Sequence, residues 1–87
     1  MPSARPIIFT RHARLRMQER GAREQDVRAA VRTGQREAAQ RGLSAYRLQV
    51  DFKREWRGRY YDVQEIEAIA AEEDASIVIV TVYTFYS

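Results

Sequence analysis

The only histidine of this 87-residue chain lies in line with two arginines. His12, Arg16 and Arg20 follow one another at intervals of four residues, and a helix with about 3.6 residues per turn places such side chains along one stripe. Histidine is the side chain whose unperturbed pKa lies near neutrality, and arginine grips phosphate with a planar, permanently charged fork. The row predicts a site where an RNA phosphate is held and a proton is moved.

Metal-independent RNA cleavage needs three groups: a base for the proton of the ribose 2′-hydroxyl, a cation for the charge that develops at phosphorus, and an acid for the leaving oxygen. His12 is the candidate base or acid, and Arg16 and Arg20 are the candidate phosphate clamps. Tyr83, near the end of the chain, is a candidate to orient a base or to donate a proton.

A structural alternative accounts for the same row without any reaction. His12 would then form a hydrogen bond with a strand carbonyl, while Arg16 and Arg20 would pair with Glu19 or with carboxylates of residues 65–74. Under this alternative the row is an internal network rather than a ligand site.

Cations interleaved with aromatic residues form a second candidate surface, which suits contact with sugar-phosphate and stacking of bases. Its predicted RNA-binding members are Arg47, Lys53, Arg54, Trp56, Arg57 and Arg59, with Tyr60 beside them, and Arg11 joins them next to the helical row. The simpler interpretation is a solvated turn whose tryptophan folds partly onto the sheet.

The charges are unevenly distributed along the chain, whose net charge is +3. Residues 1–36 carry +6, residues 37–59 carry +3 and residues 60–87 carry −6. This asymmetry favours a basic face for a polyanion, although arginine enrichment can also reflect genomic base composition.

The chain contains no cysteine, which excludes a disulfide or a thiolate metal site and suits a reducing compartment. No apolar run approaches the roughly 18 residues of a membrane span. We therefore expect a cytoplasmic protein with no cofactor, no metal and no membrane partner.

The sequence predicts a helical hairpin over residues 9–34, after an extended lead-in over residues 1–8 in which residues 7–9 form a short strand or fill the core. Thr10 is the expected cap of the first helix and Gly21 its end, while Gly34 ends a second helix over residues 23–33.

Residues 35–87 are expected to form an antiparallel sheet. Residues 46–52 alternate apolar with polar side chains, and a hairpin turn is expected around Gly58. Residues 76–86 give another strand. Residues 61–72 fit either a helix or a strand, and we prefer the strand because two strands alone make a poor sheet. The predicted fold is one α+β domain over residues 1–87, with two N-terminal helices packed on a three- to four-stranded antiparallel sheet.

From Phe9 onward the chain contains a set of short motifs, namely Arg11-His12, Arg16-Met17, Arg20-Gly21, Asp26-Val27 and the strand Ile79-Val-Thr81-Val-Tyr83. In these motifs the chain resembles the family called domain of unknown function 4258. That family is similar to RelE-type toxins and to the wider barnase, EndoU and colicin-like ribonucleases. The resemblance implies two helices on an antiparallel sheet, RNA cleavage and neutralisation by a co-expressed antitoxin protein.

Two features depart from that pattern. Ala22 and Arg23 stand where the second helix usually has an apolar residue and a Ser or Thr cap, and no cation follows Arg59. RelE-type toxins tend to place a basic residue on the late strands, whereas EndoU-like enzymes pair helix histidines with a Thr or Ser and a Tyr there. Catalysis would therefore depend on the helical row with Thr81 and Tyr83.

The leading expectation is a toxin-type ribonuclease. The second is a non-catalytic module that binds RNA or a protein through the same basic face. A third, compatible with both, is a homodimer formed through the apolar C-terminal strand.

Overall fold

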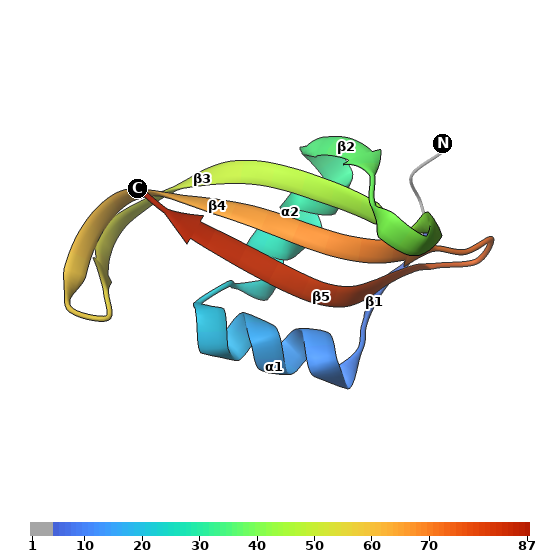
Figure 1. Cartoon of the computed structure of the whole chain (residues 1–87), viewed down its shortest axis with the longest axis horizontal. Coiled ribbons are helices and arrows are strands. Elements are labelled where there is room, and N and C mark those ends of the chain that lie inside the picture. Colours follow the sequence, from blue (N-terminus) through green and yellow to red (C-terminus); the bar gives the residue numbers. More distant parts are fainter. Residues whose placement is uncertain (1–4) are drawn as a thin grey trace.

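The computed structural model describes residues 5–87, which form two helices and a twisted five-stranded sheet (Figure 1). In chain order the elements are β1 Ile7–Phe9, α1 Arg11–Arg20, α2 Glu24–Thr33, β2 Gln35–Ala38, the 3₁₀ turn η1 Gln40–Gly42, β3 Ser44–Trp56, β4 Arg59–Glu72 and β5 Ile77–Tyr86. The strand order across the sheet is β1-β5-β4-β3-β2. Residues 1–4 of the expected lead-in lie outside the described residues.

The sheet is mixed and has five strands, which corrects the expected three- to four-stranded antiparallel sheet. β1 pairs in parallel with β5, so that Ile7 lies opposite Ile77. β2 pairs with β3 although all four of its residues are exposed. These two edge strands are short and join the sheet through their backbones, so their side chains carry little of the alternation that marks a strand in a sequence.

Residues 61–72 are strand, as preferred. They belong to β4, which pairs with β3 on one side and β5 on the other. Gln64, Ile66, Ala68 and Ala70 are buried, with only partly buried residues between them. Central pairing on both sides overrides the helical preference of the alanine and glutamate residues, since propensity is weak against tertiary context.

Both helices begin and end close to the expected residues. The Thr10 hydroxyl accepts a hydrogen bond from the amide of Ala13 at 3.0 Å, and Gly21 ends α1 in the left-handed conformation at φ 75°. α2 begins at Glu24, and Arg23 before it provides no side-chain cap. Its first turn holds two acidic residues, which interact favourably with the helix dipole.

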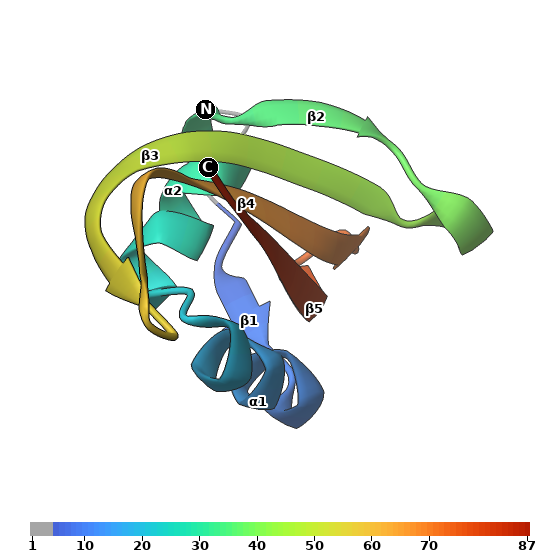
Figure 2. The ribbon, with the colours of Figure 1, turned by 60° about the vertical axis from the view of Figure 1, so that its left-hand side comes forward.

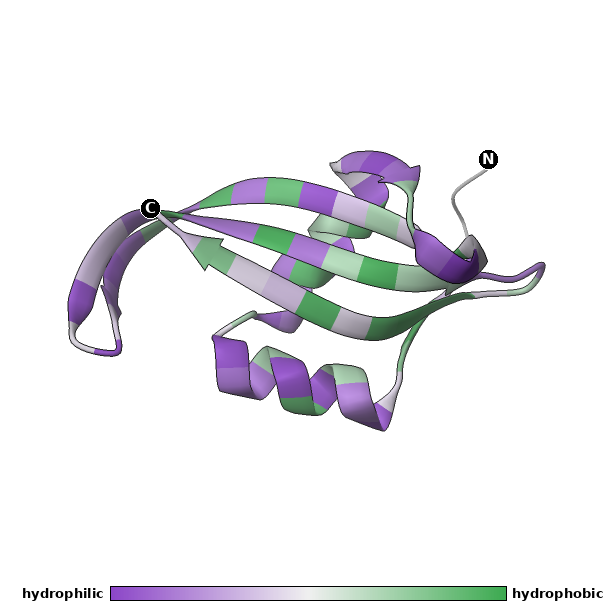
Figure 3. Cartoon of the chain, in the orientation of Figure 1, coloured by the Kyte–Doolittle hydropathy of each residue, from purple (hydrophilic) through white to green (hydrophobic). Residues whose placement is uncertain are grey.

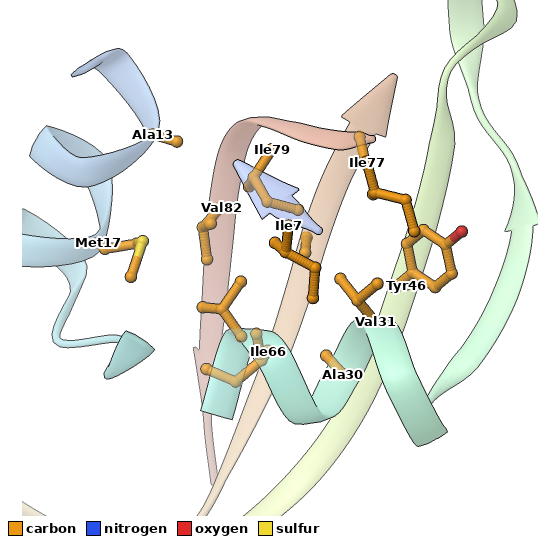
Figure 4. Close-up of a cluster of buried hydrophobic side chains, with 13 residues drawn as sticks. Ile7, Ala13, Met17, Ala30, Val31, Tyr46, Ile66, Ile77, Ile79 and Val82 are labelled. Carbon is orange, nitrogen blue, oxygen red and sulfur yellow. The ribbon is translucent and has the colours of Figure 1, made fainter. Parts of the chain in front are cut away.

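The helices pack on one face of the sheet and leave the other face open (Figure 2). α2 contributes Val27, Ala30 and Val31 to the core, whereas only Ala13 and Met17 of α1 are buried. Those two side chains of α1 point toward the strands in Figure 4. Apart from Leu15, which is 49% exposed, the rest of α1 is hydrophilic (Figure 3), so most of its surface is available for contacts with solvent or a ligand.

α1 covers the edge of β5 beyond the short β1. At the start of the helix the Thr10 amide donates to the carbonyl of Ile79 at 3.1 Å, and at its end Arg20 Nη1 donates to the carbonyl of Val82 at 2.8 Å. An unpaired strand edge would otherwise be open to pairing with another chain. The same contacts fix α1 alongside the late strand that carries Thr81 and Tyr83.

Candidate functional site

The α1 row, consisting of His12, Arg16 and Arg20, is accessible to solvent for most of its length. His12 is exposed and forms no hydrogen bond or ion pair with any of residues 5–87. Arg16 Nη1 pairs with Glu19 Oε1 at 2.7 Å, and both side chains are substantially exposed. The expected alternative of a histidine bound to a strand carbonyl is therefore wrong, whereas its pairing of Arg16 with Glu19 is confirmed.

Arg20 connects the α1 row to the open face of the sheet. Its guanidinium carbon lies 4.9 Å from the centre of the Tyr83 ring, a distance at which a cation is attracted to the ring face. Arg20 is not paired with the carboxylates of residues 65–74; the carbonyl of Val82 accepts its hydrogen bond instead. Because a guanidinium has five N–H donors, the contact leaves others for a phosphate.

A bulge in β5 turns Thr81 and Tyr83 to the open face. Ala70 lies opposite Ile79 and Ile69 lies opposite Thr81, which leaves Val80 as the extra residue of the strand. After an extra residue the alternation of a strand changes sides. Without this bulge the two hydroxyl residues would face the helices.

Three side chains fix the end of α1, and we call them the α1 clamp: Gln64, Thr84 and Tyr86. The hydroxyls of Thr84, at 3.0 Å, and of Tyr86 donate to the carbonyl of Arg20. Gln64 Nε2 donates to the carbonyl of Gly21 at 3.0 Å. The last carbonyls of a helix have no partner within it, so the clamp satisfies them and positions Arg20.

Sequence reasoning missed the α1 clamp. Gln64 is only 1% exposed, and a buried amide side chain is expected to have hydrogen-bond partners. The available signal was that Gln64 precedes a series of apolar residues at alternate positions, Ile66, Ala68 and Ala70, and so occupies an inward position itself.

Thr81 and Tyr83 line a hollow of about 370 Å³ on the open face, which we call the open-face hollow. Its remaining lining residues are Ala39, Gln40, Arg41, Leu43, Glu67, Ile69 and Val80. Arg41, which sequence reasoning also missed, is exposed and has no hydrogen bond or ion pair with residues 5–87. His12 is not among the lining residues.

Arg47 lies apart from the other predicted RNA-binding residues and its charge is already engaged. Its guanidinium contacts Glu37 at 2.9 Å and Glu67 at 3.0 Å. The hydrogen bond that the Arg47 guanidinium donates to Glu67 is the main reason that the pKa of Arg47 is raised above its ordinary value. The antiparallel register places Arg47 opposite Glu67, so the sheet brings together charges that are segregated along the sequence.

The tip of the β3–β4 hairpin folds back against the end of α1 (Figure 2). A register shift between Asp51 and Arg54 interrupts the ladder before the tip. Trp56 stacks on Tyr86 with ring centres 5.7 Å apart, and Arg57 Nη2 donates to the carbonyl of Glu19 at 2.8 Å. Since Tyr86 belongs to β5, the interpretation of a tryptophan that folds partly onto the sheet is confirmed.

The other predicted cations of this surface are distributed around the tip. Arg54 lies over Phe52 at 3.8 Å and Arg59 over Tyr61 at 5.9 Å. Lys53, like Arg11 on α1, is exposed and has no hydrogen bond or ion pair with residues 5–87. The fold thus brings Arg57 of the tip next to the end of α1, where Arg20 lies, and leaves Arg47 on the open face.

Two further findings concern residues 5–87 as a whole. None of the helices there has the length and apolarity needed to cross a bilayer. No three histidine, aspartate or glutamate side chains within that part of the chain gather as ligands for a metal ion.

Comparison with known families gives one match. The family model described as "Domain of unknown function (DUF4258)" matches residues 9–84, nearly the whole chain. No curated protein and no solved structure matches the sequence.

Proposed function

Since this chain belongs to the DUF4258 family, whose description names no activity, we propose from its own residues that it is a metal-independent endoribonuclease, with His12 transferring protons and Arg16 and Arg20 holding the phosphate. One observation carries the proposal. An exposed histidine without a partner starts the α1 row, and the opposite end of that row, Arg20, contacts the hydroxyl-bearing Tyr83.

The proposed reaction is an attack by the ribose 2′-oxygen on the adjacent phosphorus. A new P–O2′ bond forms, the P–O5′ bond breaks, and the products end in a 2′,3′-cyclic phosphate and a 5′-hydroxyl. The 2′-hydroxyl loses its proton to a base, and the leaving 5′-oxygen gains one from an acid. His12 fills one of these roles, and the Tyr83 hydroxyl is the candidate for the other, with Thr81 beside it.

The two arginines supply positive charge where negative charge develops on the phosphate. Arg20 is held by Val82 and by its contact with Tyr83, so its position requires little reorganisation. Arg16 is paired with Glu19 on an exposed surface, where ion pairs are weak. A phosphate can therefore replace the glutamate as its partner.

The resemblance to RelE-type and EndoU-like proteins supports the same proposal and extends it to a toxin restrained by an antitoxin protein. It agrees with the helix histidine and the Thr and Tyr residues of the late strand in this chain. The antitoxin and the homodimer stay predictions.

A non-catalytic RNA-binding module is the second candidate. Two observations favour it: His12 does not line the open-face hollow, and the cations of the hairpin tip have no histidine among them, although Arg57 contacts the end of α1. Such a module would bind RNA with a strong dependence on salt and leave it intact.

The two candidates separate in one cleavage assay on single-stranded RNA in the presence of a metal chelator. The proposal expects cleavage by the wild-type chain, at least about 100-fold slower cleavage by His12→Gln, and similar loss in Arg16→Ala. Arg14→Ala is the matched control, because Arg14 lies on the same helix and pairs with Glu24 instead. Binding without cleavage by the wild-type chain would establish the module instead.

A further inference from the structure

We infer that the open-face hollow binds one nucleobase of a single-stranded RNA whose phosphate lies on the α1 row. The inference rests on the proposed RNA site and names the part of the substrate that the site selects.

The walls of the hollow suit a flat, partly apolar group with polar edges. Leu43, Ile69 and Val80 contribute apolar surface, and Thr81 contributes a hydroxyl that can donate or accept a hydrogen bond. Tyr83 is 42% exposed, which leaves ring surface available for stacking. Proteins bind unpaired bases by this combination of aromatic stacking and hydrogen bonds to base edges.

Tyr83 is shared between the hollow and the α1 row. It lines the hollow, and the Arg20 guanidinium lies 4.9 Å from the centre of its ring. A base in the hollow therefore has a phosphate-binding cation as its neighbour. A double helix does not offer this arrangement, since its bases are stacked and paired, and so the occupant is single-stranded.

The charges around the hollow favour an anionic chain. The one carboxylate in the lining, Glu67, is neutralised by Arg47 at 3.0 Å. Arg41 has no such partner among residues 5–87 and is exposed in the lining, in the left-handed conformation at φ 60°. A non-glycine residue rarely adopts that conformation, and here it presents a cation on the side of the hollow formed by η1.

The test follows methyl NMR signals of the wild-type chain during titration with the four nucleoside 3′-monophosphates and, separately, with inorganic phosphate. These probes have no 5′-leaving group, so binding is observed without cleavage. The inference expects the methyl signals of Leu43, Ile69, Val80 and Thr81 to shift with at least one nucleotide and to stay in place with inorganic phosphate. Shifts confined to α1, or equal shifts with phosphate alone, would overturn it.

Two variants complete the experiment. Leu43→Trp fills the hollow from the η1 side and should weaken nucleotide binding about tenfold or more. Phe85→Trp is the matched control, because Phe85 is exposed on β5, the strand of Thr81 and Tyr83, but lies outside the hollow. The affinity of this variant should equal that of the wild-type chain. Unchanged affinity in a folded Leu43→Trp variant would also overturn the inference.

The outcomes distinguish this inference from the proposed function. Base binding in the hollow by a chain that cuts no RNA supports the inference and removes the catalytic part of the proposal. Cleavage by a chain whose hollow signals never move supports the catalytic part and overturns the inference.

Discussion

The hydroxyl group of Tyr86 donates a hydrogen bond to the backbone carbonyl of Arg20, 66 residues earlier in the chain. This hydrogen bond connects the end of β5 to the end of α1. Because the side chain of Arg20 reaches Val82 and Tyr83, this backbone contact also determines where one cation of the candidate site lies. The stability of the fold and the geometry of the site are therefore linked at this point.

Replacing Tyr86 by phenylalanine should lower the free energy of unfolding by about 1 kcal/mol, because a half-buried carbonyl loses one of its donors. Urea denaturation measures this change. Tyr60→Phe is the control, since Tyr60 is 58% exposed and its hydroxyl has no partner among residues 5–87. Equal stability of the two variants would show that the Tyr86 hydroxyl does not hold the helix.

Gly21→Ala should destabilise the protein by about 2–4 kcal/mol, since it combines a left-handed backbone with overpacking. Gly21 has φ +75°, and an added Cβ would lie 2.9 Å from Trp56 ring atoms. Gly42 also has a positive φ, +74°, but open space around it. Gly42→Ala should therefore cost only about 1 kcal/mol. Thermal unfolding measures the loss of stability in both variants. Equal losses in Gly21→Ala and Gly42→Ala would contradict this account.

Glu72 should make stability depend on acidic pH. Its pKa is lowered, mainly because the Arg36 guanidinium donates hydrogen bonds to it at 2.8 and 2.9 Å. A lowered pKa in the folded state contributes stability that is fully present above the ordinary value of 4.5 and is lost as the pH falls through the lowered pKa.

Chemical denaturation between neutral pH and pH 3 tests this contribution. Glu72→Gln should be less stable than the wild-type chain at neutral pH, and the gap should close in acid. Glu73→Gln, the exposed neighbour, should follow the wild-type curve. A gap that persists unchanged at pH 3 would assign the loss to something other than the charge of Glu72.

Arg16 and Arg47 should differ in their contribution to RNA binding. Replacing Arg16 by alanine should reduce the slope of log affinity against log salt by about one, as for a cation that contacts phosphate. Arg47→Ala should leave the slope unchanged, because Glu37 and Glu67 already neutralise that guanidinium. Salt-dependent binding of a labelled single-stranded RNA measures both. A larger effect from Arg47 would place the RNA on the open face alone.

The sequence predicts best those features that depend on neighbouring residues. Thr10 and Gly21 mark the ends of α1 through local capping chemistry, and the α1 row follows from helical spacing. The alternation of residues 46–52 likewise identifies β3. Each of these signals is complete within a few residues, so no knowledge of the sheet is needed to read it.

Features that depend on strand register could not be predicted from the sequence. The extra residue Val80 turns Thr81 and Tyr83 to the open face, and nothing in the local alternation indicates this. The polar strand β2 exists only because β3 lies beside it. The contact of Arg20 with Tyr83 and the hydrogen bond of Gln64 with Gly21 likewise require the folded sheet. For the same reason Arg41 had no predicted role.

The most direct measurement uses a DNA oligonucleotide that contains a single ribonucleotide, incubated with the chain in the presence of a chelator. The account predicts one cut, on the 3′ side of that ribonucleotide, with a 2′,3′-cyclic phosphate on the product, and no cut by a folded His12→Gln variant. An intact oligonucleotide after incubation with the wild-type chain, or equal cutting by His12→Gln, would contradict it.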